Sequence, residues 1–191
     1  MRVNPTLLIL VLIILLGCNT ENENKTQFTS LKAEETNLFF QNNLTEAKNT
    51  NVLLYEYFYN GGGLALADFN GDEKLDIYIS SNMEENKMYL NKGDFVFEDI
   101  TVIAKTSGRK GPWKTGVTAV DINSDGRMDI YVCYSGKIKE NGRKNQLFLN
   151  MGNNENGIPI FTEVARLYGL DSSAYSNQGY FFDYDRDGDL D

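Results

Sequence analysis

Three short stretches of this chain carry oxygen-bearing side chains at the same spacing, and that spacing suits the coordination of a hard cation. Each stretch has Asp or Asn at positions 1, 3, 5 and 9. Calcium takes about six to eight oxygen ligands in flexible geometry, and the backbone carbonyl of position 7 would add another ligand. The sequence therefore predicts three calcium loops, called loops one, two and three below. The predicted ligands are Asp68, Asn70, Asp72, Lys74 (carbonyl) and Asp76 in loop one; Asp121, Asn123, Asp125, Arg127 (carbonyl) and Asp129 in loop two; and Asp183, Asp185, Asp187, Asp189 (carbonyl) and Asp191 in loop three.

An EF-hand and a metal-free turn are the two alternatives to such a calcium loop. An EF-hand needs a bidentate Glu at position 12 and flanking helices, but position 12 is Ile79 in loop one and Val132 in loop two. Asp, Asn and Gly also form turns without any metal, which stays the alternative for a single loop. Three loops with one spacing and similar flanks favour calcium, in a structural role and with weak affinity, about 10⁻⁴–10⁻³ M as in extracellular modules.

The three loops differ in ways that predict unequal binding. Position 6 is Gly126 in loop two and Gly188 in loop three, but Glu73 in loop one. A left-handed backbone there costs a non-glycine residue about 1–2 kcal/mol, so loop one is expected to be the weaker of the first two, with Gly71 easing the turn. Loop three has Gln178 where the other loops have Gly five residues before the first Asp.

The stretches around the loops repeat as well, with four short strand-like runs in each unit and the acidic loop between the first two. The runs are residues 63–67, 75–80, 86–91 and 97–100, and then 116–120, 128–133, 145–150 and 161–164. Such units at a period of about 50 residues are typical of β-propeller blades. We expect an all-β partial propeller with blades at about 61–104, 114–165 and 177–191, the last one truncated. Two full blades cannot close a ring of about four to eight, so a longer polypeptide is expected. The aromatic run at 52–59 predicts one further strand.

The N-terminus predicts export and a lipid anchor. Residues 7–16 form an unbroken apolar run after a basic start, too short to span a bilayer as a helix. The small residue before Cys18 resembles a bacterial lipobox, which implies cleavage after residue 17 and lipidation of Cys18; an ordinary signal peptide is the alternative. Residues 1–17 are then the signal peptide, 18–27 a lipidated Cys with a flexible polar tether, and 28–191 the propeller region.

Composition excludes several classes of function. With 18 basic and 27 acidic residues the chain does not suit nucleic acid, and without His it has no Ser-His or Cys-His pair and no usual zinc site. Cys133 lies in an apolar strand pattern and is expected to be a buried, inert thiol without a disulfide partner. Trp113, in the basic stretch 105–115, is open to two interpretations: packing against a neighbouring blade, or stacking on a sugar or a partner side chain.

Four motifs together resemble the FG-GAP/VCBS repeat family, including its bacterial members that carry an ASPIC/UnbV domain. They are residues 63–72 (GLALADFNGD), 86–91 (NKMYLN), 113–123 (WKTGVTAVDIN) and 181–191 (FFDYDRDGDLD). The resemblance covers about residues 38–191. It implies a calcium-stabilised propeller like that of integrin α-chain heads, used for adhesion or recognition outside the cell, with any ASPIC/UnbV domain beyond residue 191.

The expected function is therefore a non-enzymatic, calcium-binding module for adhesion, recognition or scaffolding. It would sit at the bacterial cell envelope as an outer-membrane lipoprotein, facing the periplasm or the surface, held by Cys18 and binding an unknown protein or glycan. The alternative is a substrate-holding propeller region of a larger polysaccharide-active enzyme with a catalytic domain beyond residue 191. A spacer that binds calcium alone is a third hypothesis.

Overall fold

The computed structural model describes residues 27–191. The predicted signal peptide, lipidated Cys18 and nearly all of the tether lie outside the described residues. The chain divides after Leu31, and the unit described below is Lys32–Asp191. Within residues 27–191, no helix reaches the length and apolarity that crossing a membrane requires.

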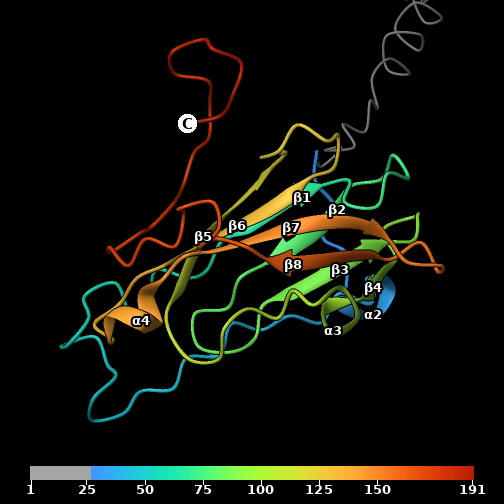
Figure 1. Cartoon of the computed structure of the whole chain (residues 1–191). Helices are drawn as coiled ribbons and strands as arrows, with labels where there is room; N and C mark the ends of the chain where they lie inside the picture. Colours follow the sequence, from blue (N-terminus) through green and yellow to red (C-terminus); the bar gives the residue numbers. More distant parts are fainter. Residues whose placement is uncertain (1–26) are drawn as a thin grey trace, which may run out of the picture. The chain divides into compact units, whose positions relative to one another are not determined.

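The unit is built from two four-stranded antiparallel sheets, each with its strands in sequence order (Figure 1). The first sheet contains β1 (Leu64–Ala67), β2 (Asp76–Ile79), β3 (Lys87–Asn91) and β4 (Phe97–Asp99). The second contains β5 (Lys114–Val120), β6 (Asp129–Tyr134), β7 (Gln146–Asn153) and β8 (Pro159–Glu163). The only helices among the described residues are the four-residue turns α2 (Ala33–Thr36), α3 (Thr101–Ala104) and α4 (Glu140–Arg143). The predicted all-β class and the four strands per unit are confirmed.

The core lies between the two sheets, where one face of each packs against the other. The first sheet contributes Ala65, Ala67, Tyr78, Met88 and Leu90, and the second contributes Val117, Ile130, Val132, Tyr134, Phe148 and Phe161. These positions alternate along most of the strands, as expected when successive side chains point to opposite faces. A second, smaller cluster of Tyr131, Cys133, Leu147 and Ala165 covers the other face of the second sheet. Cys133 is buried, and burial raises the pKa of its thiol to about 11, which agrees with the expected inert thiol.

A tyrosine–asparagine pair recurs at the same place in both sheets. The Asn86 side-chain amide donates to the Tyr78 hydroxyl over 2.8 Å, and Asn145 donates to Tyr131 over the same distance. The amide oxygen of each Asn accepts a backbone N–H near the end of the second strand, from Ser81 in one sheet and Tyr134 in the other. The sequence repeat is thus a repeat of buried polar contacts as well as of strands.

The first strands of successive units lie against one another at glycines. A side chain on Gly63 would fall 2.5 Å from the backbone nitrogen of Val117, and one on Gly116 would fall 2.4 Å from the carbonyl of Asn177. Only glycine allows backbones to approach so closely. Residues 176–182, expected to begin a third blade, follow β5 through hydrogen bonds such as Gly116 N–H to the Asn177 carbonyl (2.8 Å), although they form no strand themselves.

The strand predicted at 52–59 is wrong, because local hydrogen bonds fold this segment into turns. The Asn51 side-chain oxygen accepts the backbone N–H groups of Leu53 and Leu54 at 3.1 and 3.3 Å. Its carbonyl accepts the N–H of Tyr55. Asn side chains offer the backbone this alternative to a strand, and a hydrophobic pattern alone does not reveal it.

Candidate metal centre in three acidic loops

The three acidic loops share one backbone conformation, with left-handed residues at positions 4 and 6. The φ angles at these positions are 78° and 66° at Gly71 and Glu73, 57° and 83° at Ser124 and Gly126, and 66° and 97° at Arg186 and Gly188. The predicted left-handed turn at position 6 is therefore present even where Glu73 replaces glycine. Position 4 is left-handed too, which the sequence did not indicate in loops two and three, because Ser and Arg stand there.

The Asp at position 1 organises each loop from inside. Its oxygens accept the backbone N–H groups of positions 5 and 6 in all three loops. The distances are 3.1 and 2.7 Å for Asp68, 3.0 and 2.8 Å for Asp121, and 3.2 and 3.1 Å for Asp183. Backbone hydrogen bonds thus fix the position-1 side chain at the centre of each loop, where a calcium site needs an oxygen ligand.

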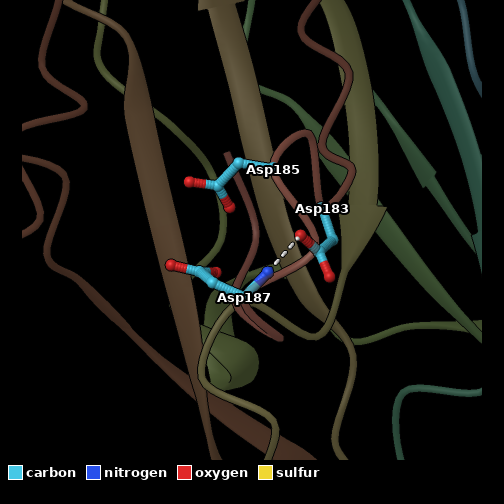
Figure 2. A group of neighbouring side chains, drawn as sticks. All are labelled: Asp183, Asp185 and Asp187. Atoms are coloured by element: carbon cyan, nitrogen blue, oxygen red, sulfur yellow. Dashed lines mark hydrogen bonds between the residues drawn. The ribbon is translucent and has the colours of Figure 1, made fainter.

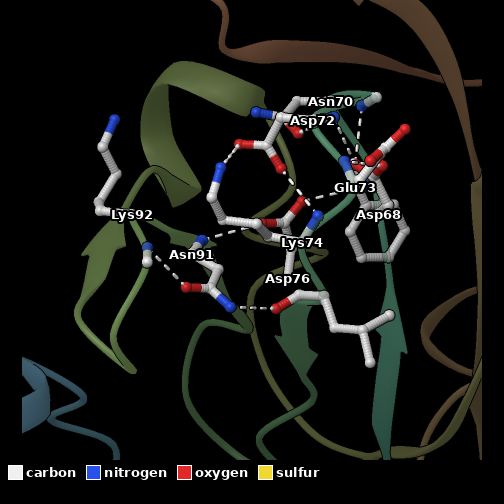
Figure 3. A network of polar contacts seen from close by, with 12 residues as sticks. Asp68, Asn70, Asp72, Glu73, Lys74, Asp76, Asn91 and Lys92 are labelled. Atoms are coloured by element: carbon white, nitrogen blue, oxygen red, sulfur yellow. Dashed lines mark hydrogen bonds and ion pairs between the residues drawn. The ribbon is translucent and has the colours of Figure 1, made fainter.

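The Asp at position 9 has a role that the spacing alone did not indicate. Asp76 is fully buried, and its two oxygens accept the N–H of Phe69 at 3.0 Å and of Asn91 at 2.8 Å (Figure 3). Asp129 does the same with Ile122 at 3.1 Å and Asn150 at 2.7 Å. Burial raises the pKa of Asp76 to about 6 and also raises that of Asp129, against the opposing effect of these hydrogen bonds. The second and third strands are tied together through this side chain.

Position 5 is paired with a basic side chain in the first two loops. The Lys74 ammonium lies 3.0 Å from Asp72 (Figure 3), and the Arg127 guanidinium contacts Asp125. Partial burial alone would raise the pKa of Asp72, but hydrogen bonds from Lys74 and Asn70 outweigh it and lower the pKa. Both pairs are largely exposed, so they contribute little to stability. They do offset part of the negative charge of loops one and two.

Loop three lacks this pairing, because its position 7 is Asp189 and its basic residue, Arg186 at position 4, forms none of the ion pairs within residues 27–191. Asp183, Asp185 and Asp187 offer carboxylate oxygens that all lie within 4.8 Å of one another, and all three side chains are exposed. Figure 2 shows the three side chains projecting from the same short loop. The hydrogen bond and charge of Asp187 raise the pKa of the adjacent Asp189 carboxyl. Among residues 27–191 this is the group in which three acidic side chains converge most closely on one point.

The donor set fits a hard cation. All side chains brought together are carboxylates and amides, the ligand types that calcium prefers over the nitrogen and sulfur ligands typical of zinc. Asn70 and Asn123 stand at position 3 of their loops, where each amide oxygen accepts the N–H of position 5, at 3.2 and 3.3 Å. In loop two the Asn123 amide nitrogen also donates to Asp125, so coordination there requires the amide oxygen to turn toward the ion.

Two asparagines of the third strands support loop one, and sequence reasoning did not single them out. Asn91 donates through its side chain to the Leu75 carbonyl at 3.0 Å. Its counterpart Asn150 donates to Met128 in its own sheet and to Phe69 in loop one of the first sheet. The available signal was the recurrence of Asn at the end of the 86–91 and 145–150 runs.

Trp113 is 2% exposed and packs on the N-terminal segment. Its ring lies 5.3 Å from that of Tyr55 and 5.0 Å from that of Phe58, centroid to centroid. Of the two interpretations above, packing is confirmed, although the partner is the segment before the first sheet and not a neighbouring blade.

Comparisons with known proteins agree with the repeat. The FG-GAP-like repeat family matches residues 68–132, from the first residue of loop one into β6. The chain is 30% identical over 134 residues to cartilage acidic protein 1 of Homo sapiens, a match covering 69% of this chain and 19% of that protein. The Mus musculus and Xenopus tropicalis proteins of the same name are 29% and 27% identical, covering 69% and 71% of this chain and 20% and 21% of theirs. The chain spans about a fifth of the length of these curated relatives.

Proposed function

We propose that loops one, two and three bind calcium, and that the chain is a non-catalytic module for adhesion, recognition or scaffolding outside the cytoplasm. The observation that carries this proposal is the common loop form: left-handed residues at positions 4 and 6 around a position-1 Asp fixed by backbone N–H groups. Three loops that differ at positions 4, 6 and 7 adopt it, and the similarity to an FG-GAP-like repeat includes two of them.

Calcium would act as a structural ion in these loops. The oxygens of positions 1, 3 and 5, the carbonyl of position 7 and the Asp of position 9 are its proposed ligands. Because loops one and two each join the first two strands of a unit, neutralising their carboxylates would stabilise that connection. Loop three carries the most unbalanced negative charge and therefore gains the most from a cation.

We further propose that the two sheets are blades of a propeller. In the second sheet, Val117 is 5% exposed because its face packs on the first sheet. The equivalent face of the first sheet presents Leu64 and Leu66, which are 56% and 52% exposed. Because the two sheets have the same strand order and equivalent faces, we infer that a further unit of the same kind covers Leu64 and Leu66, as the first sheet covers Val117. Closure of a propeller ring would require such a unit. The close backbone contacts at Gly63 and Gly116 support this side-by-side arrangement of successive units.

The anchor is part of the proposal. The apolar run at 7–16 and Cys18 support a lipidated protein at a bacterial envelope. A labelled fatty acid supplied to expressing cells should be incorporated into the wild-type protein and not into Cys18→Ser. Incorporation into both variants would contradict the anchor.

The calcium function is tested by isothermal titration of Ca²⁺ into the metal-stripped full chain. We expect uptake that Asp187→Asn reduces and Asp94→Asn leaves unchanged. Asp94 is a suitable control because it is exposed, has a positive φ of 50° that Asn tolerates, and lies outside the three loops. If the wild-type chain takes up no calcium, the proposal is wrong.

A further inference from the structure

Two adjoining cavities lie at the end of the second sheet opposite loop two. Loop two joins the end of β5 to the start of β6, and the cavities lie beyond the other end of β6, where residues 135–138 meet the segment 49–58. Their volumes are about 200 and 300 Å³, and they share Leu54, Tyr55 and Lys137. Pockets for small ligands are commonly about 300–1,000 Å³, so the pair suits a small ligand.

Aromatic rings form much of the wall. Tyr55 stands between the two cavities, in edge contact with Trp113 at 5.3 Å and with Tyr57 at 5.9 Å. Tyr57 and Tyr175 line the larger cavity and are 51% and 62% exposed. Tyrosines held in this way present rigid contact area with an apolar face and a polar tip. A ligand of matching chemistry has apolar ring faces and many hydroxyl groups.

Polar groups at the site make few interactions with the rest of the protein. The Tyr55 hydroxyl is buried and has no hydrogen-bond partner, and among the described residues it is the only buried side-chain polar atom in that state. An unsatisfied buried group of this kind costs about 1–3 kcal/mol. Lys137 lines both cavities and forms none of the ion pairs within residues 27–191. Asn177 also lines the larger cavity.

We propose that this aromatic cleft, defined by Tyr55, Tyr57, Trp113, Lys137 and Tyr175, binds a short saccharide. The C–H faces of the sugar rings would pack on the exposed tyrosines, while hydroxyl groups hydrogen-bond Tyr55, Lys137 and Asn177. A purely apolar ligand would leave the Tyr55 hydroxyl unsatisfied. A nucleotide would need more positive charge than the lining offers, because Lys137 shares the larger cavity with Glu56, and Arg143 lies over the Tyr175 ring without lining either cavity. The proposal deepens the recognition role proposed above by naming its surface and ligand class, and it does not require calcium.

The chain's single tryptophan lines the smaller cavity and makes the test direct. Trp113 fluorescence of the full chain is titrated with cellotriose, maltotriose and trigalacturonic acid, and any binding is repeated by calorimetry. We expect at least one trisaccharide to change the emission. Tyr55→Phe should weaken its binding about five- to tenfold, the loss of one hydrogen bond, without lowering the Tm. Tyr57→Ala should weaken it at least as much.

Matched controls separate the cleft from the rest of the surface. Tyr59→Phe removes a hydroxyl that hydrogen-bonds Glu46 outside both cavities, and Tyr180→Ala removes an exposed ring outside them. Both should bind like the wild type. The inference is overturned if none of the three saccharides changes the emission, or if Tyr55→Phe and Tyr57→Ala bind as tightly as the wild type. Saccharide binding without calcium uptake would overturn the calcium function alone, and calcium uptake without saccharide binding would overturn this inference alone.

Discussion

The side-chain amide of Asn150 donates a hydrogen bond over 2.9 Å to the backbone carbonyl of Phe69, 81 residues earlier in the chain. Asn150 belongs to the second sheet, and Phe69 is the second residue of loop one. Nearby, Asn153 donates to the carbonyl of Asn70 over 2.7 Å. Loop one is therefore held partly by the sheet that follows it, and its stability depends on the packing between units.

Asn150→Ala should destabilise the protein by about 1–3 kcal/mol, because it leaves the buried backbone carbonyl of Phe69 without this hydrogen-bond donor. The counterpart Asn91→Ala should cost less, since the Asn91 side chain donates only to Leu75 in its own sheet. The measurement is the free energy of unfolding in urea with a chelator present. Equal losses in the two variants would show that the bond between the sheets contributes nothing.

Asp129→Asn should also destabilise the metal-free protein, again by about 1–3 kcal/mol. Asp129 accepts a backbone N–H group on each of its two oxygens. An asparagine would replace one oxygen with an NH2 group, which would face an N–H donor instead of accepting from it. Asp125→Asn is the control, because Asp125 is exposed. Thermal unfolding with a chelator separates this effect from calcium binding. A loss that appears only when calcium is present would assign position 9 to the ion instead.

Glu73→Gly should stabilise loop one. Glu73 has a φ of 66°, and glycine would relieve up to about 1 kcal/mol of backbone strain. The Tm should rise, and calcium affinity in loop one should rise with it. Glu155→Gly serves as the control, because Glu155 is also exposed but is not among the residues with positive φ. A fall in Tm for Glu73→Gly would show that the Glu73 side chain itself stabilises the loop.

Lys114 should make stability increase with pH above about 8. Its side chain is fully buried, with the ammonium donating to the carbonyl oxygens of Glu84 at 2.5 Å and Gly111 at 3.0 Å. Burial lowers the pKa of Lys114 from 10.5 to about 8. Between these two values the unfolded chain binds more protons than the folded one. The free energy of unfolding therefore rises with pH across that window.

The measurement is the difference in the free energy of urea unfolding between wild type and variant from about pH 8 to 9.5, because burial raises the pKa of Cys133 to about 11 and gives every variant the same opposing slope there. Lys114→Met should remove the rise, whatever its effect on absolute stability, and the exposed Lys110→Met should keep it. A slope that is the same in Lys114→Met as in the wild type would contradict the assignment.

The strands and the loops could be predicted from the sequence because both depend on local pattern. Alternating hydrophobic residues and the recurrent Asp spacing place the ends of β1 to β8 within three residues of their observed positions. The contact of Asn150 with loop one could not be predicted in this way, because it depends on how two sheets pack. The burial of Trp113 could not be predicted either, because it depends on packing against Tyr55 and Phe58, which are distant in the sequence.

Position 9 shows a different limit. Type and spacing predict Asp76 and Asp129 as metal ligands, but their complete burial and paired backbone contacts follow from the register of the second and third strands. The sequence pattern predicts a carboxylate at this position, but it does not predict how many backbone N–H groups that carboxylate accepts. The strand expected at 52–59 is absent for the opposite reason. Local hydrogen bonds to the Asn51 side chain fold this segment into turns despite its hydrophobic pattern.

The asparagine bond between the sheets uses a main-chain oxygen as its acceptor, and every amino acid has one. Mutations in loop one could therefore accumulate without breaking the link to the following unit, provided that the asparagine is kept. Each tyrosine–asparagine pair, in turn, joins two strands of one unit. A duplicated unit would thus inherit both its internal pair and the position from which an asparagine reaches the neighbouring loop.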